Sequence, residues 1–233
     1  MLKVRKSSER GGANFGWLNS QHTFSFGSYQ DSRHMGVGPL RVINEDHVQA
    51  GRGFESHGHK NMEIISYVLD GALEHKDSMG NGSVLRPGDV QRMSAGSGVV
   101  HSEFNHSKTE QVHFLQIWIM PNTANDAPGY EEKHFDAASK QGKLRLIASP
   151  DGREGSVSLR QEASIYAAIL DGADAVEHKL AAGRQLYVHV IRGSVKVNGL
   201  DLSGGDAVHV DKEAGISLTD AKNSEVLVFD LPY

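Results

Sequence analysis

The sequence contains no cysteine among its 233 residues. This absence excludes disulfide bonds, thiol catalysis and thiolate metal sites, so any metal must be bound by histidine, carboxylate or carbonyl groups. Proline is also scarce, at 6 residues against 26 glycines, and this balance favours β structure with many tight turns over long helices. Histidine, in contrast, is plentiful at 13 residues, so imidazole is an abundant potential metal ligand.

The chain also lacks an excess of basic residues and a long hydrophobic run. Its 24 Lys and Arg against 29 Asp and Glu give a formal net charge of -5, so we expect no direct binding to nucleic acid or to an anionic membrane. The longest uncharged apolar stretch, Val112–Pro121, is too short for a membrane helix and fits one buried strand. The positive N-terminus, Met1–Arg10, has no apolar segment behind it, unlike a secretion signal. We therefore expect a cytoplasmic protein.

Strand signals recur along the whole chain, whereas helix signals are weak. Short apolar segments alternate with clusters of Gly, Asp, Asn and Ser, which is typical of an all-β barrel or sandwich. Only Glu131–His134 and Ala137–Lys140 are expected to form a turn or a short helix. The expected strands are Leu40–Ile43, Glu63–Leu69, Ala72–Lys76, Asp89–Met93, His113–Met120, Lys143–Ala148, Ile165–Leu170, Leu186–Ile191, Ser194–Val197, Asp206–Val210 and Glu225–Asp230.

A faint internal repeat indicates two similar halves. In both Tyr67–Glu74 and His189–Lys196, a strand runs into a glycine and the next strand begins at once. Such patterns also occur in unrelated β proteins, so the repeat alone does not decide the question. We infer two β domains, residues 1–135 and 136–233, joined by the polar segment Asn122–Gly142 as a linker.

Two histidine-containing pairs carry the strongest chemical signal. His57 and His59 are two residues apart, and so are His101 and Glu103. On a strand, residues i and i+2 point to the same face. If the two strands are neighbours, three imidazoles and one carboxylate surround a single centre, a donor set that suits Fe, Mn, Co, Ni, Cu or Zn. The alternative is two unrelated surface pairs.

These pairs lie in stretches that resemble the two motifs of the cupins. The departures are Gly96, where a proline is usual, and a spacing from Glu63 to Gly71 that is one residue longer than the common form. More specifically, the chain resembles the pirins, a bicupin family. The matching stretches are Arg10–Leu18, His22–Phe26, His57–Glu63, Glu74–Asn81 and Met93–Glu103.

The resemblance implies a fold and a ligand set. It implies two jelly-roll-like β-barrel domains face to face, with one divalent transition metal in the N-terminal domain. The implied ligands are His57, His59, His101 and Glu103, while Glu63 is a supporting or salt-bridged residue. We expect iron(II) first, with Ni, Co, Mn, Cu and Zn left open. The positions in the second half that correspond to the ligands carry no ligand set, so we expect no metal there.

The resemblance also implies an activity. Bacterial pirins are associated with quercetin 2,3-dioxygenase activity, so we expect an enzyme that opens a flavonol ring with O2 and releases carbon monoxide. Glu103, the only carboxylate of the implied ligand set, is the expected general base. The alternative is a non-enzymatic metal-binding regulator that binds a transcription factor or a metabolic enzyme. A metal-dependent isomerase or hydrolase also stays open, because cupin folds host many chemistries.

The remaining aromatic and histidine residues have weaker signals. Either His113 or Gln116 is expected to point into the first barrel, with a satisfied core role as the alternative. His22, Phe24 and Phe26 alternate, and they either border the pocket or pack the N-terminal segment. His75 and His106 are expected at the surface, and Trp17 and Trp118 in the core.

Overall fold

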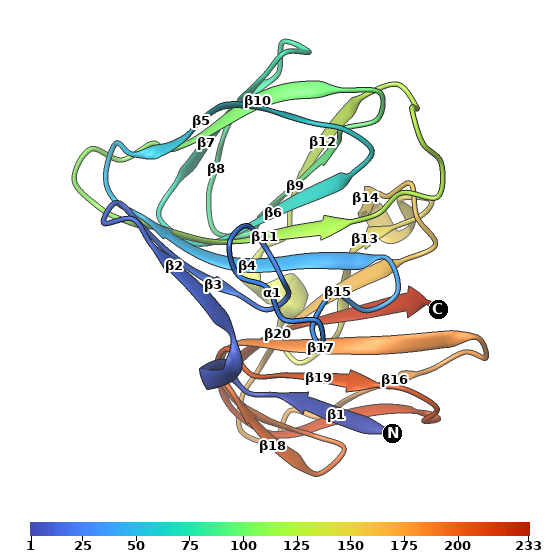
Figure 1. Ribbon diagram of the computed structural model, residues 1–233. Helices are drawn as coiled ribbons and strands as arrows, with labels where there is room; N and C mark the ends of the chain where they lie inside the picture. Colours follow the sequence, from blue (N-terminus) through green and yellow to red (C-terminus); the bar gives the residue numbers. More distant parts are fainter. The chain divides into compact units, whose positions relative to one another are not determined.

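The structure, a computed structural model, describes all residues from Met1 to Tyr233. The chain folds almost wholly into strands, with one short α-helix and two 3-10 turns (Figure 1). This confirms the all-β expectation. None of its helices has the length and hydropathy that a membrane-spanning helix requires.

The contacts divide the chain into two compact units. The N-terminal unit comprises Gly11–His134 and Val157–Gln161, and the C-terminal unit comprises Met1–Arg10, Phe135–Ser156 and Glu162–Tyr233. Residues 1–10, expected in the N-terminal half, belong to the C-terminal unit because β1 (Leu2–Arg5) pairs antiparallel with β19 (Ala207–Val210). The division at residue 135, as a boundary between domains that fold separately, stays a prediction.

The N-terminal unit is built from two antiparallel sheets. One sheet has the order β5-β10-β7-β8, and the other has the order β12-β9-β6-β11-β4-β3-β2. The bounds are β2 (Gly11–Asn14), β3 (Leu18–His22), β4 (Leu40–Val48), β5 (Gly53–His59), β6 (Glu63–Asp70), β7 (Leu73–Asp77), β8 (Gly82–Leu85), β9 (Asp89–Ser94), β10 (Val99–Asn105), β11 (Val112–Ile119) and β12 (Gly129–His134). The unit also contains the short strand β14 (Val157–Ser158), which belongs to neither of these sheets.

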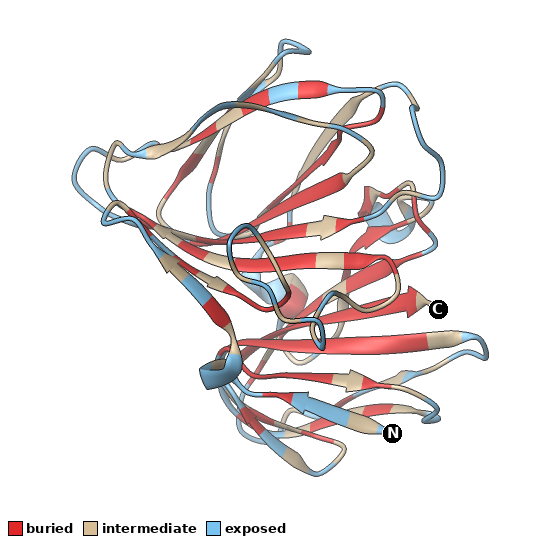
Figure 2. Ribbon diagram, viewed as in Figure 1, coloured by how far each residue is buried: buried red, intermediate tan, exposed pale blue.

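These two sheets do not close into a barrel. The edge strands of the small sheet, β5 and β8, pair only with β10 and β7. The unit is therefore jelly-roll-like, as expected, and takes the form of an open sandwich rather than a closed barrel. Its interior is filled by side chains from both sheets, such as Val48 of β4, Leu73 of β7 and Phe114 of β11, so it needs no closure to exclude water. Figure 2 shows the buried stretches along these strands.

The C-terminal unit is dominated by two long strands. The sheet order is β1-β19-β17-β20-β15-β13, with β18 pairing β17 and β16 pairing β20. The remaining elements are η1 (Ser7–Glu9), α1 (Ala137–Lys140), β13 (Arg145–Ser149), η2 (Arg153–Gly155), β15 (Ser164–Leu170), β16 (Val176–Lys179), β17 (Arg184–Val197), β18 (Leu200–Ser203) and β20 (Gly215–Pro232). The register between β17 and β20 shifts at three points between Val190 and Lys196. Such bulges bend a strand pair, and β17 contributes residues to the apolar core on both sides of them, from Leu186 to Val197.

The repeat seen in the sequence has a conformational counterpart. Gly71 and Gly193 both adopt positive φ, at 80° and 70°. A Cβ atom on Gly71 would lie 2.7 Å from the carbonyl oxygen of Gln111, and one on Gly193 would lie 2.1 Å from that of Asn223. Both positions therefore require glycine. The two halves use the same turn device, consistent with two cupin domains.

The segment expected to be a linker contains two regular elements, β12 and α1. Glu131–His134, expected as a turn or a short helix, forms the end of β12, and all six residues of this strand pair with Asp89–Ser94 of β9. That expectation is wrong because the ladder with β9 outweighs the weak helix signal. Ala137–Lys140 forms α1 as expected, and Asp136 caps it by accepting a hydrogen bond from the Ser139 backbone N–H.

Candidate metal centre

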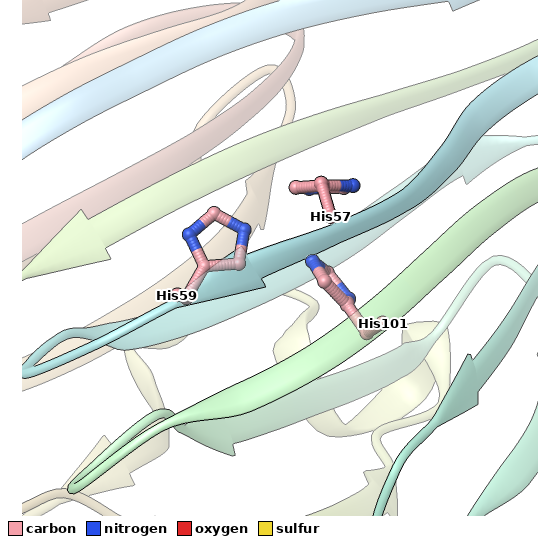
Figure 3. Close-up of side chains that lie close together, drawn as sticks. All are labelled: His57, His59 and His101. Carbon is pink, nitrogen blue, oxygen red and sulfur yellow. The ribbon is translucent and has the colours of Figure 1, made fainter.

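Three histidines converge on one point inside the N-terminal unit. His57 and His59 project from one face of β5, and His101 on β10 is the direct pairing partner of His57. Figure 3 shows the three rings turned toward one another. Ligand atoms of all three lie within 4.8 Å of one another. The predicted pairing of the two histidine strands is thus present.

The backbone fixes which nitrogen of His57 is available. Its Nδ1 lies 2.7 Å from the carbonyl oxygen of Glu55. A carbonyl oxygen only accepts, so Nδ1 carries the proton and donates it, and Nε2 keeps its lone pair. A metal binds an unprotonated imidazole nitrogen, so this tautomer leaves Nε2 of His57 available as a ligand atom.

A buried chain of hydrogen bonds does the same for His101. Asp77 lies 3.2 Å from Nε2 of His75, and both side chains have 0% exposure. The carboxylate can only accept, so His75 donates from Nε2 and is left with a lone pair on Nδ1. That atom is 3.5 Å from Nδ1 of His101, which must therefore donate. His101 Nε2 is then a buried acceptor, and it has no hydrogen-bond partner in the structure.

This orphaned atom is the sharpest sign that the residues fit a metal. Buried polar atoms in proteins are rarely left without a partner. Burial, followed by the neighbouring His57 and His59, lowers the pKa of His101 to about 3. Burial, followed by His57, lowers the pKa of His59 to about 4. Both rings are therefore neutral near pH 7, as ligation requires, and the donor set suits a divalent first-row ion.

Glu103 lies next to this group in a different hydrogen-bonded setting. It is buried at 2% exposure, and its oxygens accept hydrogen bonds from Ser66 Oγ at 3.0 Å and Gln116 Nε2 at 2.9 Å. Its carboxylate forms a second close group with His75 and His101, and this group shares His101 with the group of three histidines. Burial raises its pKa, which makes it a better proton acceptor than an exposed carboxylate.

A cavity of about 200 Å³ opens beside His57, His59 and Glu103. It lies between the two sheets, because its wall includes residues of β5 and β10 on one side and of β3, β4 and β11 on the other. Its aromatic wall residues are Phe15, Phe26, Phe54 and Trp118. Edge-to-face contacts link His59 to Trp118 at 5.0 Å and Trp118 to Phe26 at 5.4 Å between ring centroids. The arrangement forms a rigid slot for a flat, apolar molecule.

His113 and Gln116, both on β11, have different partners in the structure. Gln116 points into the cavity and binds Glu103, whereas His113 binds Glu45 at 3.0 Å. Glu63 is buried and accepts hydrogen bonds from Ser94 Oγ at 2.9 Å and the Arg160 backbone N–H at 3.2 Å. It has a structural role and does not line the cavity.

Among the remaining residues, one expectation is wrong and another is incomplete. His75 does not lie at the surface: β7 pairs with β10, and this pairing buries it behind His101. His106 is half-exposed, as expected. Trp118 packs against the core but also lines the cavity. His22 and Phe26 line the cavity as well, while Phe24 is buried outside its wall.

Four polar residues of the cavity wall did not emerge from the sequence: Ser20, Ser28, Asn44 and Asp46. The strand that begins at Leu40 was expected to end at Ile43, where polar residues begin. It continues to Val48, and strict alternation puts Asn44, Asp46 and Val48 on the inner face. The longer strand could have been predicted from this alternation, because the apolar Val48 follows Asn44 and Asp46 at the same two-residue spacing.

Comparison with known proteins gives matches over both halves. Residues 3–119 match the family described as Pirin, and residues 146–231 match the quercetinase C-terminal cupin domain. A protein of Escherichia coli (strain K12) named quercetin 2,3-dioxygenase is 47% identical over 232 residues, covering 100% of this chain and 99% of its own. A pirin-like protein of Caulobacter vibrioides is 37% identical, covering 99% of both chains. The crystal structure of the Escherichia coli pirin YhhW in complex with nickel(II) has a TM-score of 0.95 at 46% identity, covering 100% of this chain and 99% of that one.

Proposed function

This chain belongs to the pirin family, and on that premise we propose that it is a metal-dependent dioxygenase that cleaves a flavonol such as quercetin with O2. One observation carries the proposal: the lone pairs of His57 and His101 are directed by their hydrogen bonds toward a common point, beside a cavity with aromatic walls. The name of the Escherichia coli relative, quercetin 2,3-dioxygenase, supports the choice of substrate class.

We assign the metal ligands to His57, His59, His101 and Glu103. Glu103 accepts one hydrogen bond on each oxygen, and a carboxylate oxygen has two lone pairs, so each oxygen keeps one for a metal. When bound, the ion lowers the pKa of a substrate hydroxyl and orients the substrate for reaction with O2. Iron(II) is our first choice, and the nickel(II) complex of the Escherichia coli pirin supports nickel as an alternative.

The chain's own contribution to the chemistry is proton transfer and exclusion of water. Glu103 takes the proton of the flavonol 3-hydroxyl, because its buried setting raises its pKa and because Ser66 and Gln116 hold it in one orientation. The rings of Phe26 and Trp118 hold the flat substrate in the cavity. The regulatory alternative, the cytoplasmic location and the absence of a metal in the second domain stay predictions.

The test is the substitution Glu103→Gln, which keeps the shape but removes the charge and the proton acceptor. With metal bound, we expect quercetin turnover in air to fall by about 10²–10⁴-fold, the usual value of a positioned general base. Part of this loss should be recovered at high pH, where the flavonol ionises without help. The assay follows the flavonol absorption band, with parallel metal analysis.

Two controls make this result decisive. Anaerobic quercetin shows whether loss of absorption requires O2. Heat-denatured protein with the same metal shows how much loss is uncatalysed oxidation. If Glu103→Gln turns over quercetin at the parent rate with metal bound, Glu103 is not the base. If the metal-loaded parent protein turns over no flavonol, the proposed activity is wrong.

A further inference from the structure

The cavity wall opposite the histidine group carries three polar atoms that have no partner. They are His22 Nδ1, Asn44 Oδ1 and Asp46 Oδ1. All three residues line the cavity, and each is only 4% exposed. We call these three residues the polar row. Buried polar atoms in native proteins are almost always satisfied by protein, water or a ligand, so the polar row requires an occupant.

Strand register explains why the polar row is a continuous surface. Asn44 and Asp46 are two residues apart on β4 and so share its inner face. His22 on β3 pairs directly with Asn44, and Ser20 pairs directly with Asp46. On the other side, Gln116 of β11 also pairs with Asn44. The polar row therefore lies on the large sheet, whereas His57, His59 and His101 lie on the small sheet.

The free atoms define the chemistry of the occupant. Asn44 Oδ1 can only accept hydrogen bonds, and the free oxygen of Asp46 accepts when ionised and donates when protonated. Ser20 already bonds the Asp46 carboxyl group. A hydroxyl group both donates and accepts, so it satisfies either state of Asp46. An anionic group does not fit, because Asp46 and Glu103 already bring two carboxyl groups to the cavity.

The remaining walls define the body of the occupant. The ring of His22 meets Phe26 edge-to-face at 5.2 Å between centroids, and Phe26 meets Trp118 in the same way. Trp118 in turn meets the metal-group residue His59. A continuous line of rings thus connects the polar row with the histidine group. This line suits one flat aromatic molecule that reaches both.

We propose that the polar row is a subsite for hydroxyl groups on a benzene ring of the substrate. It makes the protein select flavonols with hydroxyls on the benzene rings over flavonols that carry only the 3-hydroxyl. This inference rests on the proposed function for the identity of the substrate. It assigns Asn44 and Asp46 as specificity-determining residues that touch the part of the substrate remote from the reacting carbon atoms.

The test compares two flavonols that share the 3-hydroxyl and the 4-carbonyl group. Quercetin has hydroxyls on both benzene rings, and 3-hydroxyflavone has none. Their Kd values are measured without O2 on the nickel(II)-loaded protein by quenching of tryptophan fluorescence, which Trp118 on the cavity wall should report. In air, kcat/KM is measured for both. We expect the parent to prefer quercetin by about 10-fold or more, because a hydrogen bond to a charged or buried group is lost with 3-hydroxyflavone.

Two substitutions test whether Asp46 and Asn44 cause the preference for quercetin over 3-hydroxyflavone. Asp46→Leu and Asn44→Leu keep the approximate volume but remove the hydrogen-bonding atoms, so each should bring the quercetin preference close to one, mainly by weakening quercetin binding. The matched control is Glu45→Gln, which changes the intervening residue of the same strand on the face away from the cavity, and it should keep the parent preference.

The outcomes separate this inference from the proposed function. If quercetin is preferred in Kd and the preference depends on Asp46 or Asn44, the subsite is supported even when no turnover occurs. If the parent turns over both flavonols with equal kcat/KM and equal Kd, water alone fills the polar row and the inference is wrong, while the proposed function stands. A preference that survives both leucine variants also overturns it. The comparison in the parent needs no variant, so a folding defect cannot hide a failure.

Discussion

The substitution His75→Phe tests how the fold prepares His101 for a metal. The His75 ring is fully buried and stacks on Tyr130, with 5.2 Å between ring centroids and 27° between ring planes. A phenylalanine ring fills nearly the same volume and keeps this stacking. Asp77 remains held by the side chain of Asn81 and by the backbone N–H groups of Met79 and Asn81. The fold should therefore survive, while both ring nitrogens disappear.

The expected magnitude follows from the lost hydrogen bond. Without His75, the Nδ1–H of His101 has no acceptor, and nothing holds the ring in the tautomer that leaves Nε2 free. Removal of such an outer partner typically weakens metal affinity by about 10–100-fold. We expect a loss of nickel(II) affinity in this range at pH 7. The loss should lie near the lower end of the range, because the hydrogen bond between the two rings is long, at 3.5 Å.

The assay is a competition titration of nickel(II) against a chelator with both variant and parent. The matched control is His106→Phe, which removes an exposed histidine that bonds Glu74 at the surface and should leave the nickel Kd unchanged. An unchanged Kd in folded His75→Phe would refute the argument that the Asp77–His75–His101 chain sets the ligand tautomer.

Three further predictions concern the metal, the pH dependence and the backbone. His57→Ala or His101→Ala should remove nearly all bound metal by elemental analysis, whereas His178→Ala should keep it; full occupancy in His57→Ala would contradict the site. Burial raises the pKa of Asp46 to about 7, so the folded state holds this proton more tightly than the unfolded chain, and stability is lost as pH rises from about 4 to about 7. In the metal-free protein, Asp46→Asn should therefore gain Tm over the parent between pH 5 and pH 8; a constant difference would show that Asp46 is ionised throughout. Gly193→Ala should lower Tm by several degrees, because its Cβ would meet a carbonyl oxygen at a positive φ; an unchanged Tm would mean that the turn relaxes freely.

Much of the candidate site could be predicted because its signal is local. His57 and His59 are two residues apart, and so are His101 and Glu103, which matches the two-residue side-chain period of a strand. Pairing of β5 with β10 then brings the three histidines together. Gly71 and Gly193 likewise mark turns that only glycine permits, so the two halves were visible before the structure.

Other parts could not be predicted, because they depend on partners distant in sequence. His75 looks like a surface residue in a charged stretch, and only the pairing of β7 with β10 buries it behind His101. Asp46 looks like part of a polar loop, yet a ladder with Ser20 and Phe114 keeps it in a strand. The N-terminal strand β1 pairs with β19, about 200 residues away in sequence. Local propensity carries no information about such pairing.

The chemistry of quercetin loss tests the central claim most directly. Metal-loaded protein is mixed with quercetin under ¹⁸O₂, and the ring-opened product and the released gas are analysed by mass spectrometry. The account predicts that both labelled atoms enter the product and that carbon monoxide is released in an amount equal to the quercetin consumed. Loss of quercetin without label in the product, or without carbon monoxide, would contradict it.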